Sequence, residues 1–81
     1  MKYYLKDHVT DEMLVAVGFG IIKNTYGYKW AVKNRFKDDC ILITLHNVGD
    51  NYRGVCTYPY DKDVTPIIQD LIQLGYVEVR E

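Results

Sequence analysis

Cys40-Ile41-Leu42-Ile43-Thr44-Leu45-His46 is the most apolar run of the chain and consists mainly of β-branched and bulky aliphatic residues. Turn-forming residues flank it on both sides, in segments 37–39 and 47–51. A short apolar run between such segments is typical of a strand in an antiparallel meander. We therefore predict that residues 40–46 form the central strand of a sheet.

Three further segments are predicted to form strands beside the central one, and they span residues 20–24, 28–35 and 52–58. The first two are joined by a turn at Gly27, which can adopt a positive φ. Along 28–35, aromatic and aliphatic side chains alternate with cations. This alternation is typical of a strand with one buried face and one solvated face.

The register of these strands is predicted from two tight turns, at 37–38 and at 49–50. The turns place Val32 opposite Ile43 and Cys56 beside Ile43, so that apolar side chains meet on one face. The predicted buried face of the sheet comprises Ile22, Tyr28, Trp30, Val32, Ile41, Ile43, Leu45, Cys56 and Tyr58.

The opposite face of the sheet is then expected to meet solvent and to carry cations. The candidate binding residues are Lys29, Lys33, Arg35 and Arg53 on this face, with Tyr26 and Tyr52 at its rims. Three interpretations stay open: a merely solvated face, a surface for a partner protein, or a nucleic-acid surface using charge and stacking. The last is disfavoured, because the rings of residues 28–32 are predicted to lie on the buried face.

Two helices are predicted from their end signals. Thr10 is a candidate N-cap followed by acidic residues, and Gly18 is a candidate stop for this first helix. Thr65 followed by proline predicts the start of the second helix, which Gly75 would end. Residues 77–80 alternate and predict a final strand at an edge of the sheet, whereas residues 3–5 are either a short strand or an extended lead-in.

The length and charge of the chain limit its class. The 81 residues suffice for a single domain, residues 1–81, with one modest core, which argues against an enclosed catalytic cavity. The net charge of −1 argues against both a generic nucleic-acid binder and an acidic DNA mimic. The sequence shows neither an apolar run long enough to span a membrane nor a signal peptide, so a cytoplasmic location without membrane contact is expected.

The cysteines and histidines give no sign of a catalytic or metal site. Cys40 is expected near Tyr58 or Pro59, too far from Cys56 for a disulfide, so both thiols are expected to be reduced. The spacings of the two cysteines with His8 and His46 match no zinc motif. We expect no enzymatic activity, no catalytic residue, no metal and no cofactor.

The fold expected from these signals is α+β: an antiparallel four-stranded meander with two helices packed on one face and a C-terminal edge strand. An exposed edge strand can pair with a second copy of the chain or accept another polypeptide, so a homodimer through an edge strand is one expected assembly.

Two stretches resemble small orphan proteins encoded by phages and prophages of Gram-positive bacteria. One runs from Tyr4-Leu5-Lys6-Asp7 through Met13-Leu14 to Gly18-Phe19, and the other is Asp70-Leu71-Ile72-Gln73-Leu74-Gly75-Tyr76-Val77-Glu78-Val79. The resemblance covers about a third of the chain and carries over no catalytic residue. It implies an accessory protein of a mobile element. The function expected is therefore a non-enzymatic protein-interaction module that acts on a host or phage protein, and the alternative is a weak nucleic-acid binder using the cationic sheet face.

Overall fold

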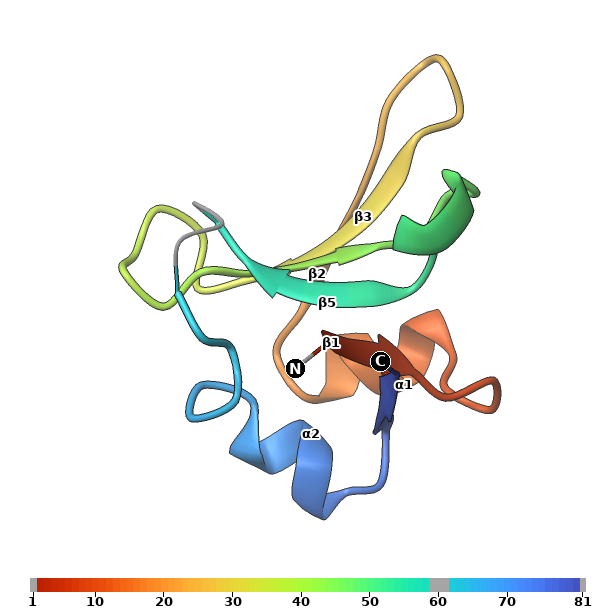
Figure 1. Ribbon diagram of the computed structural model, residues 1–81. Coiled ribbons are helices and arrows are strands. Elements are labelled where there is room, and N and C mark those ends of the chain that lie inside the picture. The colour runs from red at the N-terminus through yellow and green to blue at the C-terminus, as the bar shows by residue number, and fades with distance from the viewer. Residues whose placement is uncertain (1, 59–61, 81) are drawn as a thin grey trace.

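The computed structural model describes residues 2–58 and 62–80, which form one six-stranded antiparallel sheet and two short α-helices (Figure 1). The elements in chain order are β1 (Lys2–Leu5), α1 (Asp11–Ala16), β2 (Gly20–Lys23), β3 (Lys29–Lys33), β4 (Ile41–Thr44), the 3₁₀ helix η1 (Gly49–Asn51), β5 (Gly54–Thr57), α2 (Gln69–Gln73) and β6 (Val77–Arg80). The strand order across the sheet is β2-β3-β4-β5-β1-β6.

The α+β class is confirmed, but the predicted sheet is incomplete. Strands β2 to β5 form a meander as expected, and β1 pairs with β5 while β6 pairs with β1. The N-terminal segment is a strand because Tyr3 and Leu5 bury their side chains in the core. The sheet therefore has six strands instead of four plus a separate edge, and β6 lies at one edge as predicted.

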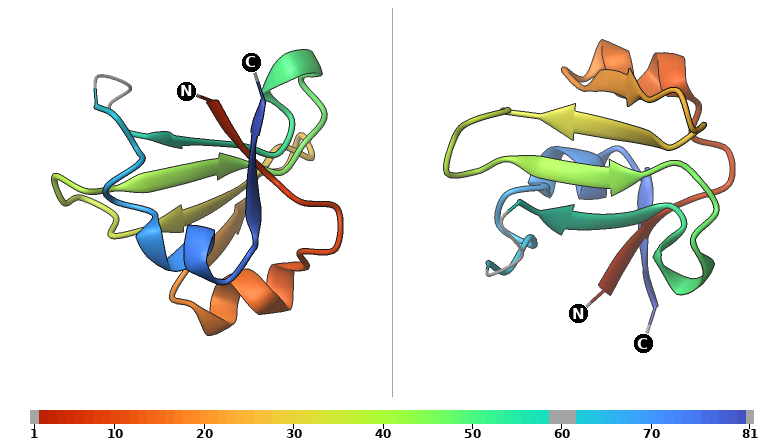
Figure 2. Two further views of the ribbon diagram at one scale, coloured as in Figure 1. Left: turned by 60° about the horizontal axis from the view of Figure 1, so that its bottom comes forward. Right: turned by 90° about the horizontal axis from the view of Figure 1, so that it is seen from above.

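The core lies between one face of the sheet and the two helices (Figure 2). Leu14 of α1 and Leu71 of α2 are fully buried against Ala31 of β3, Ile43 of β4 and Val55 of β5. The sheet is strongly twisted, and β1 and β6 are turned steeply relative to β4 and β5 (Figure 2). Short helices of this kind are held by packing, because isolated helices of one or two turns are unstable in water.

The helix ends follow their local signals in three of four cases. Thr10 Oγ1 accepts a hydrogen bond from the Met13 backbone N–H at 3.3 Å, which confirms the N-cap. Gly18 and Gly75 follow the helices with φ of +102° and +73°, which confirms both stops. The predicted start at Thr65 is wrong, because α2 begins at Gln69.

The reason for the late start of α2 lies in the hydrogen bonds of Thr65. Its backbone N–H and its hydroxyl both donate to the Asp63 carboxylate, at 3.0 and 2.8 Å. The hydroxyl is therefore directed back toward the preceding loop, and residues 65–67 form a turn instead of helix. A side chain committed to such a local turn competes with helix capping.

We predict that Gly18→Ala lowers the free energy of unfolding by about 1–2 kcal/mol, because a Cβ is strained at positive φ. The new Cβ would also lie 3.3 Å from Cε of Lys33. The measurement is urea denaturation. Gly20→Ala is the matched control, since its Cβ would meet only the Val32 carbonyl oxygen, at 3.9 Å, and its φ is not positive. Equal stability of the two variants would contradict the assignment of Gly18 as a left-handed helix stop.

The predicted register of the meander is wrong by one residue at both sides of β4. Val32 lies opposite Leu42 instead of Ile43, and Leu42 lies opposite Cys56. Because side chains alternate between faces, this shift moves the side chains of β3 and β5 to the other face. The predicted burial holds for Ile41 and Ile43 of β4, whereas Trp30, Val32 and Cys56 lie on the face away from the helices.

The connection between β3 and β4 explains the shift. The predicted two-residue turn is instead a seven-residue connection, 34–40, in which Asn34 and Phe36 have φ of +58° and +67°. Under the helices, the centre of β3 is occupied by Ala31, which is completely buried. The narrow space beneath two helices accepts this small side chain, whereas the indole of Trp30 would overfill it.

Candidate functional site

The sheet surface away from the helices is the candidate site, and we call it the open face. Its strand positions are set by the register, in which Ile22 pairs with Trp30 and Val32 pairs with Leu42. The open face comprises Ile22, Trp30, Val32, Leu42, Thr44 and Cys56. All six side chains are partly exposed, and both helices of the described chain pack on the opposite face. The open face is thus mainly apolar, contrary to the predicted cationic surface.

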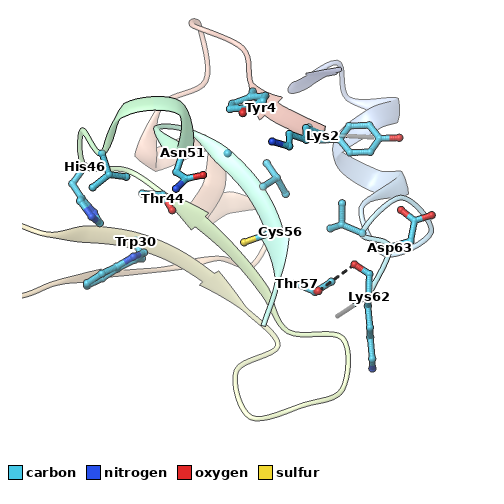
Figure 3. A pocket seen from close by; sticks show the side chains of 15 residues that line it. Lys2, Tyr4, Trp30, Thr44, His46, Asn51, Cys56, Thr57, Lys62 and Asp63 are labelled. Atoms are coloured by element: carbon cyan, nitrogen blue, oxygen red, sulfur yellow. Dashed lines mark hydrogen bonds between the residues drawn. The ribbon is translucent and has the colours of Figure 1, made fainter. Parts of the chain in front are cut away.

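Two pockets hollow this face, and Trp30 lines both. The first pocket has a volume of about 760 Å³ and lies over β4, β5 and β1 (Figure 3). Trp30 and His46 lie at one end of it, and Lys62 and Asp63 lie at the other. The second pocket has a volume of about 650 Å³ and extends from Ile22 and Leu42 to the β3–β4 connection. Both volumes fall in the range of ligand-binding pockets.

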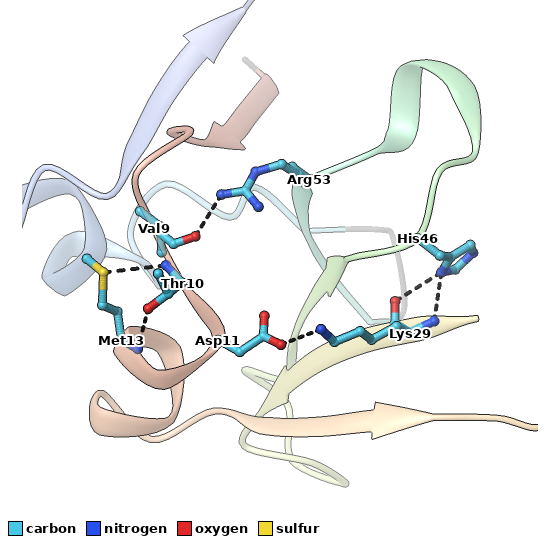
Figure 4. A network of polar contacts seen from close by, with 7 residues as sticks. All are labelled: Val9, Thr10, Asp11, Met13, Lys29, His46 and Arg53. Carbon is cyan, nitrogen blue, oxygen red and sulfur yellow. Dashed lines mark hydrogen bonds and ion pairs between the residues drawn. The ribbon is translucent and has the colours of Figure 1, made fainter. Parts of the chain in front are cut away.

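Three rings form a cluster beside the first pocket. The rings of Tyr28 and His46 are stacked with centroids 4.8 Å apart, and the Trp30 ring meets His46 edge-on at 5.0 Å. His46 Nδ1 lies 3.0 Å from the backbone nitrogen and 2.9 Å from the backbone oxygen of Lys29, which anchors the imidazole to β3 (Figure 4). Tyr28 and Trp30, predicted to be buried, therefore form part of an accessible aromatic surface.

Lys29 and Lys33, predicted on the open face, lie instead on the helix side of the sheet. Lys29 forms an ion pair with Asp11 at the start of α1 (Figure 4). Lys33 Nζ lies 2.9 Å from a carboxylate oxygen of Asp70 in α2. The one-residue shift in register causes both changes, and the long lysine stems cover apolar surface while their ammonium groups reach the rim. Neither lysine contributes to the open face.

Arg53 is also engaged within the fold. One terminal nitrogen of its guanidinium donates to the backbone oxygens of Lys6 and Val9, at 2.7 and 3.0 Å, and Figure 4 shows its contact with Val9. Its backbone has a φ of +65°, and its buried Nε has no hydrogen-bond partner among the described residues. Arg53 thus ties the start of β5 to the β1–α1 loop, and its predicted place on the open face is wrong.

The other three predicted residues are exposed, but they are dispersed. Arg35 lines the second pocket, and its guanidinium carbon lies 4.9 Å from the centroid of the Phe36 ring. Tyr26 is 83% exposed in the β2–β3 turn, 6.4 Å from Tyr28 between ring centroids. Tyr52 is exposed after η1. Of the six predicted binding residues, only Arg35 lines a pocket of the open face.

Phe36 is a candidate that the sequence interpretation missed. It is 91% exposed, has a left-handed backbone conformation and lines the second pocket. A bulky side chain at positive φ is uncommon, and such outliers concentrate at functional positions. The available signal was a single aromatic residue among the polar residues of the 34–39 segment.

The charges at the open face favour an anionic ligand. The described residues that line the two pockets include four cations and two anions, which leaves two net positive charges on a chain of net charge −1. The cations are Lys2, Arg35, Lys37 and Lys62, and the anions are Asp38 and Asp63. Hydrogen bonds from the Thr65 backbone N–H and then from its hydroxyl lower the pKa of Asp63, so this carboxyl is ionised.

The two cysteines are free thiols. The Cys40 backbone oxygen accepts a hydrogen bond from the Tyr58 backbone N–H at 3.1 Å, which places Cys40 beside Tyr58, one of the two predicted neighbours; the other, Pro59, lies outside the described residues. Burial and then the nearby Cys40 raise the pKa of the Cys56 thiol. Because the thiolate is the reactive form, the raised pKa lowers the fraction of reactive thiolate at Cys56.

Comparison with known proteins supplies no family. No protein-family model matches the chain, and neither a curated protein nor a solved structure matches it significantly.

Among the described residues, no cluster of three or more histidine, cysteine or acidic side chains could hold a metal ion. Within the same part of the chain, no helix has both the length and the apolar character needed to cross a membrane.

Proposed function

We propose that this protein is a non-enzymatic protein-interaction module that binds, through its open face, a partner segment carrying apolar and acidic side chains. The observation that carries this proposal is the row of Ile22, Trp30, Val32 and Leu42 on adjacent strands of a face that neither helix covers. Monomeric proteins rarely expose extended apolar patches unless these patches bind something.

The shape of the face supports a protein ligand. The two pockets on either side of Trp30 can each receive an anchoring side chain, and buried anchors in pockets supply most of the energy of protein interfaces. Phe36 adds a fully exposed aromatic ring at the edge of the second pocket. Aliphatic side chains such as Val32 and Leu42 favour a polypeptide over a nucleic acid, because nucleic-acid interfaces are more polar.

The chemistry of the partner follows from the charges. The net positive lining of the pockets favours acidic side chains around the apolar anchors, since complementary potentials steer association and determine specificity. The resemblance of two stretches to phage-encoded proteins supports a host or phage protein as the source of this segment.

We predict that acidic peptides with aromatic anchors change the emission of Trp30, the single tryptophan of the chain. The probe is a panel of peptides that carry two Phe or Leu anchors among Glu residues. A Kd of about 10–100 µM is expected for a small surface of this kind. The same peptides with Lys in place of Glu are the matched ligand control, and they should bind about tenfold more weakly.

Two variants test whether the binding occurs on the open face. Leu42→Asp and Phe36→Ser should each weaken binding about tenfold, because they remove apolar contacts at the second pocket. Val15→Asp is the matched control, since Val15 is 54% exposed on α1, on the helix side of the sheet. Equal binding by the acidic and basic panels, or unchanged binding by both open-face variants, would overturn the proposal.

A second candidate function is binding of single-stranded nucleic acid. It is favoured by one observation: Tyr28, His46 and Trp30 form an accessible ring cluster, and aromatic surfaces stack with bases. The sequence argument against this function assumed that the rings of Tyr28 and Trp30 were buried, and that assumption is wrong. A titration with oligothymidylate decides between the candidates. Quenching of Trp30 that falls steeply with salt would place nucleic acid first, because phosphate contacts release counterions.

A further inference from the structure

We infer that two copies of this chain pair through β6, antiparallel and centred on Val79, into one continuous sheet. This inference concerns the edge of the sheet and does not rest on the proposed function of the open face. The second copy is the occupant that the main-chain geometry and the charges of β6 fit.

The hydrogen bonds of β1 show which groups of β6 are directed outward. The Lys6 backbone N–H donates to the Tyr76 backbone oxygen at 2.9 Å, so residues 76, 78 and 80 are the ones whose main chain faces β1. The Leu5 N–H, by contrast, donates to the backbone oxygen of Arg53 next to β5. Because antiparallel pairing alternates strictly, the N–H and C=O groups of Val77 and Val79 are directed away from β1.

The main chain of Val79 is available for pairing. By this alternation its N–H and C=O lie outside the hydrogen-bonded pairs that join β6 to β1, and its side chain is 46% exposed. β6 is the last strand of the sheet, and Figure 2 shows it outside β1. The opposite edge strand is β2, and each edge strand contacts one helix, β2 contacting α1 and β6 contacting α2. An unpaired strand edge is a template for pairing with another strand.

The charges of β6 select the register. In a two-fold pairing with Val79 opposite Val79 of the second copy, Glu78 lies opposite Arg80 of the second copy, and symmetry gives this pair twice. A pairing of Val77 with Val79 of the second copy would instead place the two Glu78 carboxylates opposite each other. Opposite charges stabilise cross-strand pairs and like charges destabilise them. Within one copy Glu78 already binds Arg80 at 2.7 Å, so the dimer exchanges two pairs within copies for two pairs between copies.

The symmetry of the dimer determines how the open faces of the two copies are oriented relative to each other. The two-fold axis of an antiparallel strand pair is perpendicular to the sheet, so both open faces lie on the same side of the joined sheet. Two identical surfaces on one side can bind a bivalent or repetitive partner with avidity.

The main-chain test is sedimentation velocity from about 10 µM to 1 mM, the range in which a small interface dissociates. The wild-type protein should shift from monomer to dimer in this range. Val79→Pro should weaken dimerisation at least about tenfold, because proline removes only an N–H that is not bonded to β1. Val79→Thr keeps the N–H and the β-branched shape, and it is the matched control that should dimerise like the wild type.

The charge test uses the same measurement. Glu78→Arg should weaken the dimer about tenfold, because the substituted side chain and Arg80 of the second copy would be two cations opposite each other. The double variant Glu78→Arg/Arg80→Glu should restore the dimer. A wild-type protein that stays monomeric throughout, an unaffected Val79→Pro variant or a double variant as weak as Glu78→Arg would overturn the inference. None of these outcomes bears on peptide binding at the open face, which is measured at concentrations where the chain is monomeric.

Discussion

Arg53→Ala should lower the free energy of unfolding by about 3 kcal/mol, because it leaves two backbone carbonyls without a charged donor. These carbonyls belong to Lys6 and Val9, and they accept from the Arg53 guanidinium at 2.7 and 3.0 Å. The loss should be visible in urea denaturation. The guanidinium joins the start of β5 to the loop that precedes α1, so its removal also takes away a constraint on that loop.

The control variants separate the guanidinium from the backbone of Arg53. Asparagine tolerates a positive φ better than most residues, so Arg53→Asn keeps the backbone conformation while removing the long side chain. It should be nearly as destabilised as Arg53→Ala. Arg35→Ala, at an exposed arginine, should change stability by no more than about 0.5 kcal/mol. Similar effects of Arg53→Ala and Arg35→Ala would mean that the guanidinium does not stabilise the loop.

Ala31→Leu should be as damaging, because it inserts a large side chain at a fully buried position beneath the helices. Overpacking of a core costs about 1–3 kcal/mol, which lowers the Tm of a domain of this size by roughly 5–20 °C. Val32→Leu is the matched control one residue away, and it should leave the Tm nearly unchanged because Val32 lies on the open face. Thermal unfolding followed by circular dichroism measures both.

This pair of variants is also a direct test of the register. In the register predicted from the sequence, Val32 would be buried and Ala31 would face solvent, so the order of the two effects would be reversed. If the Tm fell for Val32→Leu and stayed unchanged for Ala31→Leu, this result would contradict the observed pairing of Ala31 with Ile43.

Relative to the sequence prediction, the lysines of β3 and the ring of Trp30 lie on exchanged faces of the sheet. Lys29 and Lys33 hold the flanks of the helices through Asp11 and Asp70. Such partly exposed ion pairs contribute little stability, but they orient the helices on the sheet. The open face carries Trp30 instead, so the surface that was expected to be cationic is mainly apolar.

The sequence correctly predicted most of the features that depend only on interactions between neighbouring residues. The cap at Thr10 and the left-handed stops at Gly18 and Gly75 depend on a few neighbouring residues, and all three are confirmed. The same holds for the turn at Gly27, whose φ is +87°. The failure at Thr65 is also local, because a carboxylate two residues earlier takes its hydroxyl.

The sequence by itself determined the α+β class, the meander of β2 to β5 and the edge position of β6, because strand alternation and turn residues act within a few positions. Only the tertiary structure decided which face of β3 is buried. Both faces of that strand carry apolar carbon, in the lysine stems on one side and in Trp30 and Val32 on the other, so alternation alone does not choose between them. The choice depends on the narrow space above Ala31 and on acidic groups of α1 and α2 that are distant in sequence.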